Sequence, residues 1–337
     1  MPTKIEWAEE TWNPVVGCTK VSTECKHCYA ERLHTKRHRA WKRGEWRGAP
    51  AQYGRPFTEV QFLEDRLSVP ARWRAPRAVF CCSMGDLFHE DLPARTILRI
   101  LNTMEQVNAN RVHAGQKPHR FMVLTKRSRR MRDILETWFD EFLEHRVAPI
   151  GAASIWFGVS VGRQEFAQRA LDLASIRSPV PLVRFVSAEP LLGSLWLDHV
   201  QADDRDGGGL YNVLTGERLD RPGQQLPGRV SWVIVGGETG RGARPMHPAW
   251  VRSLRTQAHR YGAAFFFKQW GEFAPGEAPS RTPFLLDVDG QVVPVELGGT
   301  ADLDRPVVMS RVGRRAAGRE LDGRLYEEYP EAEEVVA

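Results

Sequence analysis

The sequence lacks the long apolar runs of a membrane protein. Its 337 residues are 42% hydrophobic and 26% charged, but no stretch reaches the roughly 18 consecutive apolar residues of a membrane-spanning helix. The first ten residues, MPTKIEWAEE, carry charges where a secretory signal peptide has an apolar core. We therefore expect no membrane span, no export and a cytoplasmic location.

Familiar catalytic signatures are also absent. The sequence contains no Walker phosphate-binding loop, no H-E-x-x-H zinc motif and no ordered Ser-His-Asp triad. It has only five cysteines, which in a chain of this composition indicates metal or redox chemistry and not a disulfide framework. The net charge of +5 permits a nucleic-acid partner but does not require one.

Three of the five cysteines fall in one short segment, CTKVSTECKHCY, with the spacing C-x6-C-x2-C. Cys25 and Cys28 are close enough in sequence for their sulfurs to reach a common point, and Cys18 can fold back as a third ligand. A structural zinc site uses four ligands, whereas a four-iron cluster on three thiolates leaves one iron open. The segment indicates a 4Fe–4S cluster, with a zinc site that includes His27 or His34 as the alternative.

The other two cysteines, Cys81 and Cys82, end the apolar run AVFCC. Adjacent residues of a strand point to opposite faces of the sheet, so these two thiols are not expected to chelate a metal together. Free cysteine behaves as a small hydrophobic residue. We predict that both side chains belong to the core.

Short apolar runs alternate with helical patterns along the chain. The expected strands are at residues 78–82, 121–124, 156–161, 183–187, 232–235 and 264–267. The expected helices include one through Ile97 and Met104 and one through Phe166 and Leu173. This alternation predicts an α/β fold, a partial or full parallel βα (TIM-like) barrel. Polar and glycine residues gather after the strands, where such barrels place their active sites.

The chain is expected to divide near residue 270. Residues 1–270 form the barrel, interrupted by a Gly- and Asp-rich insertion at about 198–229 in which LTGE suggests a hairpin turn. Residues 271–337 form a small C-terminal extension of short strands, with a hairpin at Asp289–Gly290 and an acidic tail. The segment TWNPVVG, Thr11–Gly17, is expected to be turn-like.

Two segments are strongly basic. Glu31–Gly48 sets Trp41 and Trp46 among seven Lys and Arg residues, and Lys126–Arg132 carries five cations. Basic side chains with interleaved aromatic rings suit a nucleic-acid strand. The alternative for the first segment is a solvated helix with both tryptophans turned onto the core. The second segment fits a substrate-phosphate site or a solvated helix face equally well.

Seven blocks of the sequence resemble the phage-associated three-cysteine-motif family, which is similar to radical S-adenosylmethionine (SAM) enzymes. The blocks lie within about residues 5–275 and read TWNPVVGC, CKHCYAER, FCCSMGDLFHE, VLTKRSRRM, FVSAEPLLG, VIVGGETGRGARPM and FFFKQWGE. The strand and TK pair at Val123–Lys126 also resemble spore photoproduct lyases, which are radical SAM enzymes that act on DNA.

The resemblance implies a partial barrel that holds a 4Fe–4S cluster on Cys18, Cys25 and Cys28, with SAM on the open iron. Given one electron from a donor, SAM is cleaved to methionine and a 5′-deoxyadenosyl radical, which abstracts hydrogen from the substrate. The residues that the resemblance places at the SAM amino group are Ser83, Gly85 and Asp86. Those it places at the ribose or methionine are Ser160 and Glu189.

The sequence departs from the usual radical SAM pattern at three points. The first cysteine gap is six residues and not three, the position before the last cysteine is His27 and not an aromatic residue, and the Gly-Gly-Glu sequence follows a later strand. Gly236 and Gly237 of this Gly-Gly-Glu segment are candidate cofactor-binding residues, because the backbone N–H groups of GGETG can bind a phosphate or carboxylate. The substrate, reaction outcome and catalytic residues stay unassigned.

The leading hypothesis is a SAM-dependent radical enzyme that modifies or repairs a nucleic acid or nucleotide. One rival is a non-catalytic, zinc- or cluster-bearing nucleic-acid-binding protein. Another is a SAM-independent metal hydrolase using Asp86 and Glu189, although both acids can instead cap helices. The leading hypothesis requires these two carboxylates, 103 positions apart, to lie close together.

Overall fold

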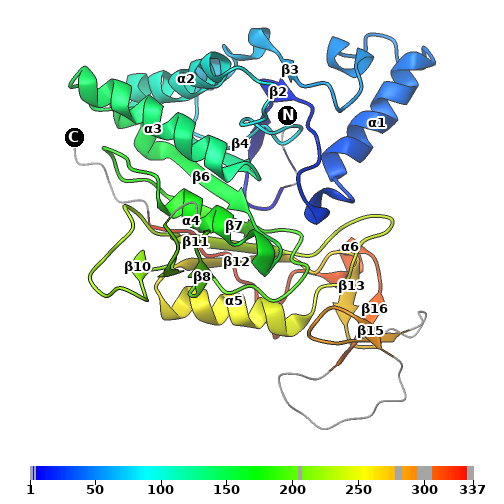
Figure 1. The fold of residues 1–337 in the computed structure, drawn as a ribbon. Coiled ribbons are helices and arrows are strands. Elements are labelled where there is room, and N and C mark those ends of the chain that lie inside the picture. The colour runs from blue at the N-terminus through cyan, green and yellow to red at the C-terminus, as the bar shows by residue number, and fades with distance from the viewer. Residues whose placement is uncertain (1–2, 4, 204–206, 278–282, 294–305, 332–337) are drawn as a thin grey trace. The chain divides into compact units, whose positions relative to one another are not determined.

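The protein consists mainly of parallel strands that alternate with helices (Figure 1). Its structure, a computed structural model, describes residues 3, 5–203, 207–277, 283–293 and 306–331. These residues form two compact units. The first contains the described residues up to Val159 together with Ser175–Val183, and the second contains Ser160–Ala174 and the described part of Arg184–Glu331. The expected division at residue 270 stays a prediction. None of the helices described has the length and apolarity to cross a membrane.

The frame of the first unit is a set of four neighbouring parallel strands. Their order is β1 (Glu10–Trp12), β4 (Ala78–Cys81), β5 (Arg120–Thr125) and β6 (Ile155–Ser160), the last residue of β6 belonging to the second unit. The register pairs Cys81 with both Trp12 and Val123. Helices α2 (Ala94–His113) and α3 (Ser128–Glu144) lie side by side in Figure 1 and turn their apolar residues inward.

Three further elements of the first unit surround the cysteine segment. A short antiparallel pair, β2 (Val15–Val16) and β3 (Gln61–Phe62), precedes and follows it in the chain. Helix α1 (Tyr29–Lys42) begins directly after Cys28, which is its N-cap residue. The run YAERLHTKRHRAWK is rich in good helix formers and has no glycine or proline, which accounts for its helical conformation.

The second unit contains three parallel strands and two small antiparallel sheets. The parallel order is β7 (Arg184–Ala188), β11 (Trp232–Gly236) and β12 (Ala264–Gln269), and α5 (Pro248–Arg260) packs on the last two. Helix α4 (Gln168–Ala174) precedes β7 in the chain. One antiparallel sheet consists of β8 (Val200–Gln201), β9 (Leu210–Asn212) and β10 (Glu217–Arg218). The other consists of β13 (Phe273–Pro275), β14 (Phe284–Leu286), β15 (Val292–Val293) and β16 (Val307–Arg311). The short helix α6 (Arg314–Ala317) follows β16 in the chain.

Most of the expected elements are confirmed. The six expected strands correspond to β4, β5, β6, β7, β11 and β12, and the α/β class with parallel strands is correct. Ile97 and Met104 are buried on α2 as predicted. The LTGE turn joins β9 to β10, and the turn at Asp289–Gly290 joins β14 to β15. The end of the acidic tail lies outside the described residues.

Three local predictions were wrong. Thr11–Gly17 is not simply a turn, because its residues supply parts of β1 and β2. The helix expected from Phe166 begins at Gln168, after a short 3-10 turn. Trp41 and Trp46 do not turn onto the core: 42% and 38% of their surfaces are exposed.

The prediction for Cys81 and Cys82 was half right. Both are buried in the core, but their sulfurs lie 3.6 Å apart instead of on opposite faces. The cause is the backbone of Cys82, whose φ of 58° is in the left-handed region. Strand alternation ends at Cys81, so the rule that separates neighbouring side chains does not apply to this pair.

Candidate functional site

Gly17 fixes the cysteine segment against the loop that follows β4. Its φ is 100°, and a Cβ atom there would lie 2.5 Å from the Glu59 carbonyl oxygen, so only glycine fits without displacement. The Gly17 N–H donates to the Met84 carbonyl at 3.0 Å, and the Cys18 N–H donates to the Phe57 carbonyl at 2.9 Å. These contacts hold the first cysteine beside the Ser83–Asp86 loop.

Cys18, Cys25 and Cys28 are free, partly buried thiols. Cys18 and Cys28 pack against one apolar cluster, formed by Val16, Ala30, Phe57 and Met84. Cys25 ends the 3-10 turn Thr23–Cys25, and Cys28 stands at the N-terminus of α1, where the helix dipole favours negative charge. In the described part of the chain, no three His, Cys, Asp or Glu side chains are arranged to hold a metal ion as they stand.

Two of these thiols differ in electrostatic environment. Burial raises the pKa of the Cys18 thiol to about 12; the Asp86 carboxylate adds to the rise and the Arg127 guanidinium opposes it. Burial also acts against ionisation of Cys25, but the Lys126 ammonium and hydrogen bonds from Val21 and Ser22 outweigh it and lower its pKa. Without a metal, the Cys18 thiol is protonated at neutral pH, so it must release its proton on binding one.

Asp86 lies at the centre of a buried hydrogen-bond network. One carboxylate oxygen accepts the Thr125 hydroxyl at 2.7 Å and the Phe88 N–H at 3.0 Å. The other accepts the Arg127 guanidinium at 3.1 Å. The side chains of Asp86 and Arg127 are only 9% and 4% exposed, so this is a desolvated ion pair. Asp86 does not cap the following helix, because α2 begins at Ala94 with Pro93 as its N-cap residue. Its pairing with a cation was part of neither sequence interpretation.

Arg127 connects this carboxylate to the cysteine segment. Its guanidinium donates to the Cys18 Sγ at 3.5 Å and to the Thr19 hydroxyl at 3.1 Å, and its Nε donates to Glu90 at 2.6 Å. Although burial acts the other way, Asp86 and Glu90 raise the pKa of Arg127. A permanently charged donor therefore faces the first cysteine. Arg127 is neither a solvated cation nor an open phosphate site, the two roles considered for its segment.

The loop after β4 has its own support. The Ser83 hydroxyl donates to Asn13 Oδ1 at 3.1 Å, and the Met84 N–H donates to the same oxygen at 2.9 Å. The Tyr29 hydroxyl, from the first turn of α1, donates to the Ser83 carbonyl. A Cβ at Gly85 would lie 3.0 Å from the Gly17 carbonyl oxygen. The proposed SAM-facing loop is thus tied to both flanks of the cysteine segment.

A second polar cluster lies within the second unit, where its parallel strands end. Glu189, directly after β7, accepts hydrogen bonds from the Lys268 ammonium of β12 at 2.8 and 2.9 Å and from the Gln269 side-chain amide at 3.5 Å. The Ser160 hydroxyl donates to the Glu189 carbonyl at 3.4 Å. A Cβ on Gly236 would lie 3.2 Å from the Glu189 carboxyl carbon. Three of the four predicted residues of this unit, Ser160, Glu189 and Gly236, are therefore neighbours.

Gly237, the fourth, permits close approach of two backbones. A Cβ there would lie 2.0 Å from the Trp270 carbonyl oxygen, and the Gly237 N–H donates to the Gln269 carbonyl at 2.9 Å. Farther along GGETG, the Gly240 N–H donates to the Glu272 carboxylate at 2.8 Å. This N–H therefore holds a carboxylate of the chain itself. The predicted proximity of Asp86 and Glu189, which belong to different units, stays a prediction.

His34 has the contacts of a core histidine. It is fully buried, its Nε2 lies 2.9 Å from the Arg55 carbonyl oxygen, and its ring packs between Tyr53 and Phe57. Burial lowers its pKa. The Arg55 carbonyl occupies Nε2, whereas Nδ1 is buried without a hydrogen-bond partner. His34 as a fourth zinc ligand stays an alternative.

A family model described as "Protein of unknown function (DUF5131)" matches residues 2–330. The chain belongs to the DUF5131 family. Searches of curated proteins and of solved structures found no match. Nearly the whole chain therefore carries the DUF5131 sequence pattern, but the family description names no function. The chemistry of this DUF5131 chain rests on its own residues.

Sequence reasoning missed the residues that connect the candidate site. Thr125 is the last residue of β5, Arg127 follows that strand, and Lys268 is the penultimate residue of β12. Each therefore stands where parallel strands place functional side chains. That position was the available signal. It was overlooked because Arg127 lies in a run of five cations, a composition that equally describes a solvated helix face.

Proposed function

We propose that this protein is an iron–sulfur, SAM-dependent radical enzyme, with a 4Fe–4S cluster on Cys18, Cys25 and Cys28. The observation that carries the proposal is the arrangement of the cysteine segment. Its three thiols are free, two of them pack on one apolar cluster, and Gly17 holds the first of them beside the buried Arg127. The donor set fits such a cluster, since three thiolates leave one iron for SAM. Cluster binding would gather the three sulfurs, which are not gathered as they stand.

The chain's own residues would then hold and shield this centre. Arg127 supplies a positive charge and a hydrogen bond at Cys18, which offsets the negative charge of bound thiolates. Asp86, Glu90 and Thr19 fix the direction of that guanidinium. The chemistry that a reduced cluster supplies to bound SAM is one-electron cleavage, for which an electron donor is required.

We further propose that SAM contacts come from both strand-end clusters. In the first unit these are the Ser83–Asp86 loop, with Asp86 acting through Arg127. In the second unit they are Ser160, Glu189, Gly236 and Gly237, where Lys268 already balances Glu189. This placement follows from the partial βα barrel that the sequence resemblance implies. We also propose a cytoplasmic location.

The direct test of this enzyme activity is SAM cleavage. The chain is reconstituted with iron and sulfide under anaerobic conditions, then incubated with SAM and dithionite, and 5′-deoxyadenosine is measured by chromatography. We expect 5′-deoxyadenosine to form only when both SAM and the reductant are present. A chain that holds a full cluster but yields none would contradict the radical SAM assignment while leaving the cluster itself in place.

The non-catalytic alternative is separated by metal content. A zinc- or cluster-bearing binding protein would release no 5′-deoxyadenosine, and its zinc form would be colourless, whereas an iron–sulfur protein is brown. A SAM-independent hydrolase would need its metal at Asp86 and Glu189, but both carboxylates are occupied by basic side chains. Their ion pairs count against metal binding by these two carboxylates.

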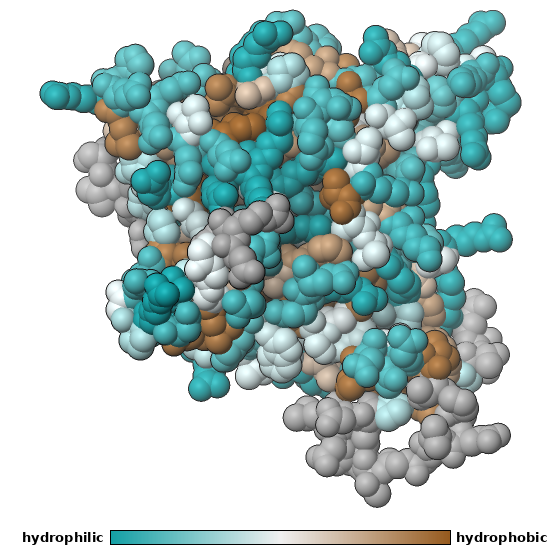
Figure 2. Space-filling view, in the orientation of Figure 1, coloured by the Kyte–Doolittle hydropathy of each residue, from teal (hydrophilic) through white to brown (hydrophobic). Residues whose placement is uncertain are grey.

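We propose that a nucleic-acid substrate meets the α1 basic surface, defined here as the exposed residues Arg32, Lys36, Arg39, Trp41, Lys42, Trp46 and Arg47. Figure 2 shows the region over α1 as largely hydrophilic. Two exposed indoles among cations are suited to stacking on bases while the cations contact phosphates. Arg37 and Arg43 are left out because they are engaged by Tyr53 and Glu45.

This surface predicts salt-dependent binding of a single strand. Replacing Arg39, Lys42 and Arg47 together by Gln removes three potential phosphate contacts, each worth about 0.7 in the slope of log K against log salt. We expect the slope to fall by about 2, measured by fluorescence anisotropy with a labelled oligonucleotide. The matched control replaces the exposed Arg72, Arg95 and Lys117 by Gln and should leave it unchanged. An equal effect of both triple variants would reject this surface.

A further inference from the structure

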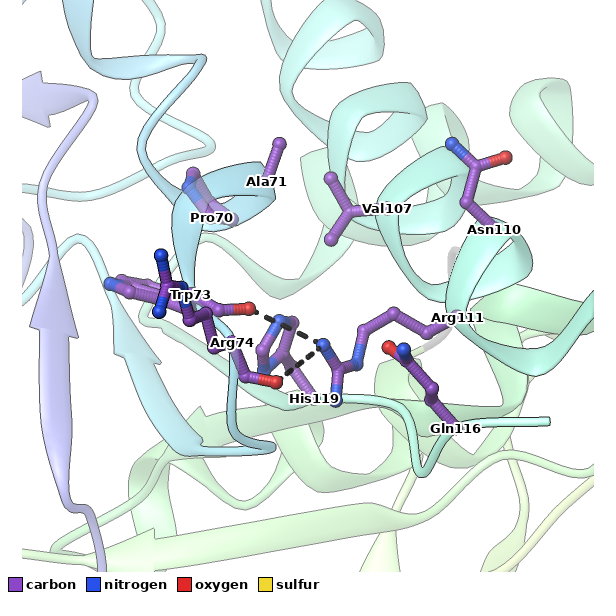
Figure 3. A pocket seen from close by; sticks show the side chains of 9 residues that line it. All are labelled: Pro70, Ala71, Trp73, Arg74, Val107, Asn110, Arg111, Gln116 and His119. Carbon is purple, nitrogen blue, oxygen red and sulfur yellow. Dashed lines mark hydrogen bonds between the residues drawn. The ribbon is translucent and has the colours of Figure 1, made fainter. Parts of the chain in front are cut away.

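A cleft in the first unit has no role in the proposed reaction. It encloses about 370 Å³ and is lined by Pro70, Ala71, Trp73, Arg74, Val107, Asn110, Arg111, Gln116 and His119 (Figure 3). This volume falls in the range of small-molecule sites, about 300–1,000 Å³. Apolar groups, one indole ring and two guanidinium groups share the lining, which is the mixture that a ligand with both apolar and anionic parts needs.

The cavity lies at the opposite strand ends from the cysteine site. Trp73 and Arg74 come before β4 and His119 comes directly before β5, whereas Asp86 and Arg127 follow those same strands. Because the strands are parallel, their amino ends share one edge of the sheet and their carboxyl ends share the other. A ligand here would bind away from the three cysteines, at an accessory site.

The charge of the lining is entirely positive. Arg74 and Arg111 contribute two cations, and no Asp or Glu is among the residues that line the cavity. Arg111 is held in place, because its guanidinium donates to the carbonyls of Trp73 and Arg74 at 3.3 Å each and to the Lys117 carbonyl at 2.8 Å. A cleft lined by one sign of charge attracts ligands of the other sign.

His119 adds an unused hydrogen-bond donor. The residue is fully buried, and its Nδ1 accepts the Arg77 N–H at 3.2 Å. Burial, with Arg111 and Arg77 nearby, lowers the pKa of this imidazole to about 4, so the ring is neutral at pH 7 and its proton is on Nε2. That Nε2 is buried without a hydrogen-bond partner, a condition that destabilises the fold unless an acceptor relieves it.

We propose that this cleft binds a small anion with a planar ring, of the mononucleotide class. Arg74 and Arg111 would take the phosphate, the wall of Trp73, Pro70 and Val107 would take the ring, and an acceptor on the ligand would meet His119. Binding at this cleft would depend on neither the cluster nor SAM. A free phosphate shares only the first of these contacts, so the two ligands can be told apart.

The test uses the full chain and two probes, adenosine 5′-monophosphate and inorganic phosphate, in isothermal titration calorimetry. We expect saturable nucleotide binding with Kd at or below about 1 mM and at least tenfold weaker binding of phosphate. Arg74→Gln, at an exposed position, should weaken nucleotide binding about tenfold through loss of a charge-assisted contact. Arg72→Gln, an exposed neighbour outside the cavity, is the matched control.

Three outcomes would overturn the proposal. Absence of saturable nucleotide binding at about 1 mM would mean that the cleft is not a nucleotide site. Equal affinity for phosphate and nucleotide would remove the contribution of the ring wall. Nucleotide binding that Arg74→Gln and Arg72→Gln affect equally would place the ligand elsewhere on the chain.

Discussion

Replacing Arg127 by methionine should destabilise the protein by about 3 kcal/mol or more. Removal of one partner from a buried ion pair leaves an uncompensated charge, at a typical cost of about 3–5 kcal/mol. Asp86 keeps the Thr125 hydroxyl and the Phe88 N–H as donors, so we expect the lower end of that range. The measurement is urea unfolding of the metal-free chain, followed by tryptophan fluorescence.

Two further variants make this prediction specific. Arg95→Met changes an exposed arginine in the first turn of α2 and should alter stability by less than about 0.5 kcal/mol. Adding Asp86→Asn to Arg127→Met removes the unpaired charge and should restore about 1–2 kcal/mol, a coupling typical of contacting residues. A loss below about 1 kcal/mol in the single variant, or no recovery in the double variant, would contradict the ion pair.

The strands and helices were largely predictable because their signals are local. AVFCC and the strand before TKRSRR are short apolar runs, and the apolar spacing of Ile97 and Met104 marks a helix face. The three-cysteine segment was equally visible, since its ligands lie within eleven positions. Residues that are close in sequence stay close in space after folding, so patterns of this kind can be interpreted without the structure.

The contacts that organise the candidate site were not predictable in the same way. Arg127 and Cys18 are 109 positions apart, and Lys268 and Glu189 are 79 apart; no periodicity in the sequence links such pairs. The Cys81–Cys82 contact depends on one left-handed backbone residue, which strand alternation cannot anticipate. Asp86, Arg127 and Cys18 come from three separate segments, which only the folded structure brings together.

Loss of any one of Cys18, Cys25 or Cys28 should abolish a stable cluster. Each replacement by Ala removes one of only three thiolate ligands, and the fold should tolerate the change because all three side chains are only partly buried. Cys81→Ala and Cys82→Ala are the controls. These thiols are buried in the core, so their loss should cost stability through lost packing and leave iron binding intact.

Iron and acid-labile sulfide, measured on the anaerobically reconstituted chain and on these five alanine variants, test the central claim most directly. We expect about four iron and four sulfide per chain in the unsubstituted protein and in the Cys81 and Cys82 variants. The Cys18, Cys25 and Cys28 variants should each retain less than about a tenth of that iron. Full iron retention in all three of them, or bound zinc without sulfide in the unsubstituted protein, would contradict the three-cysteine cluster.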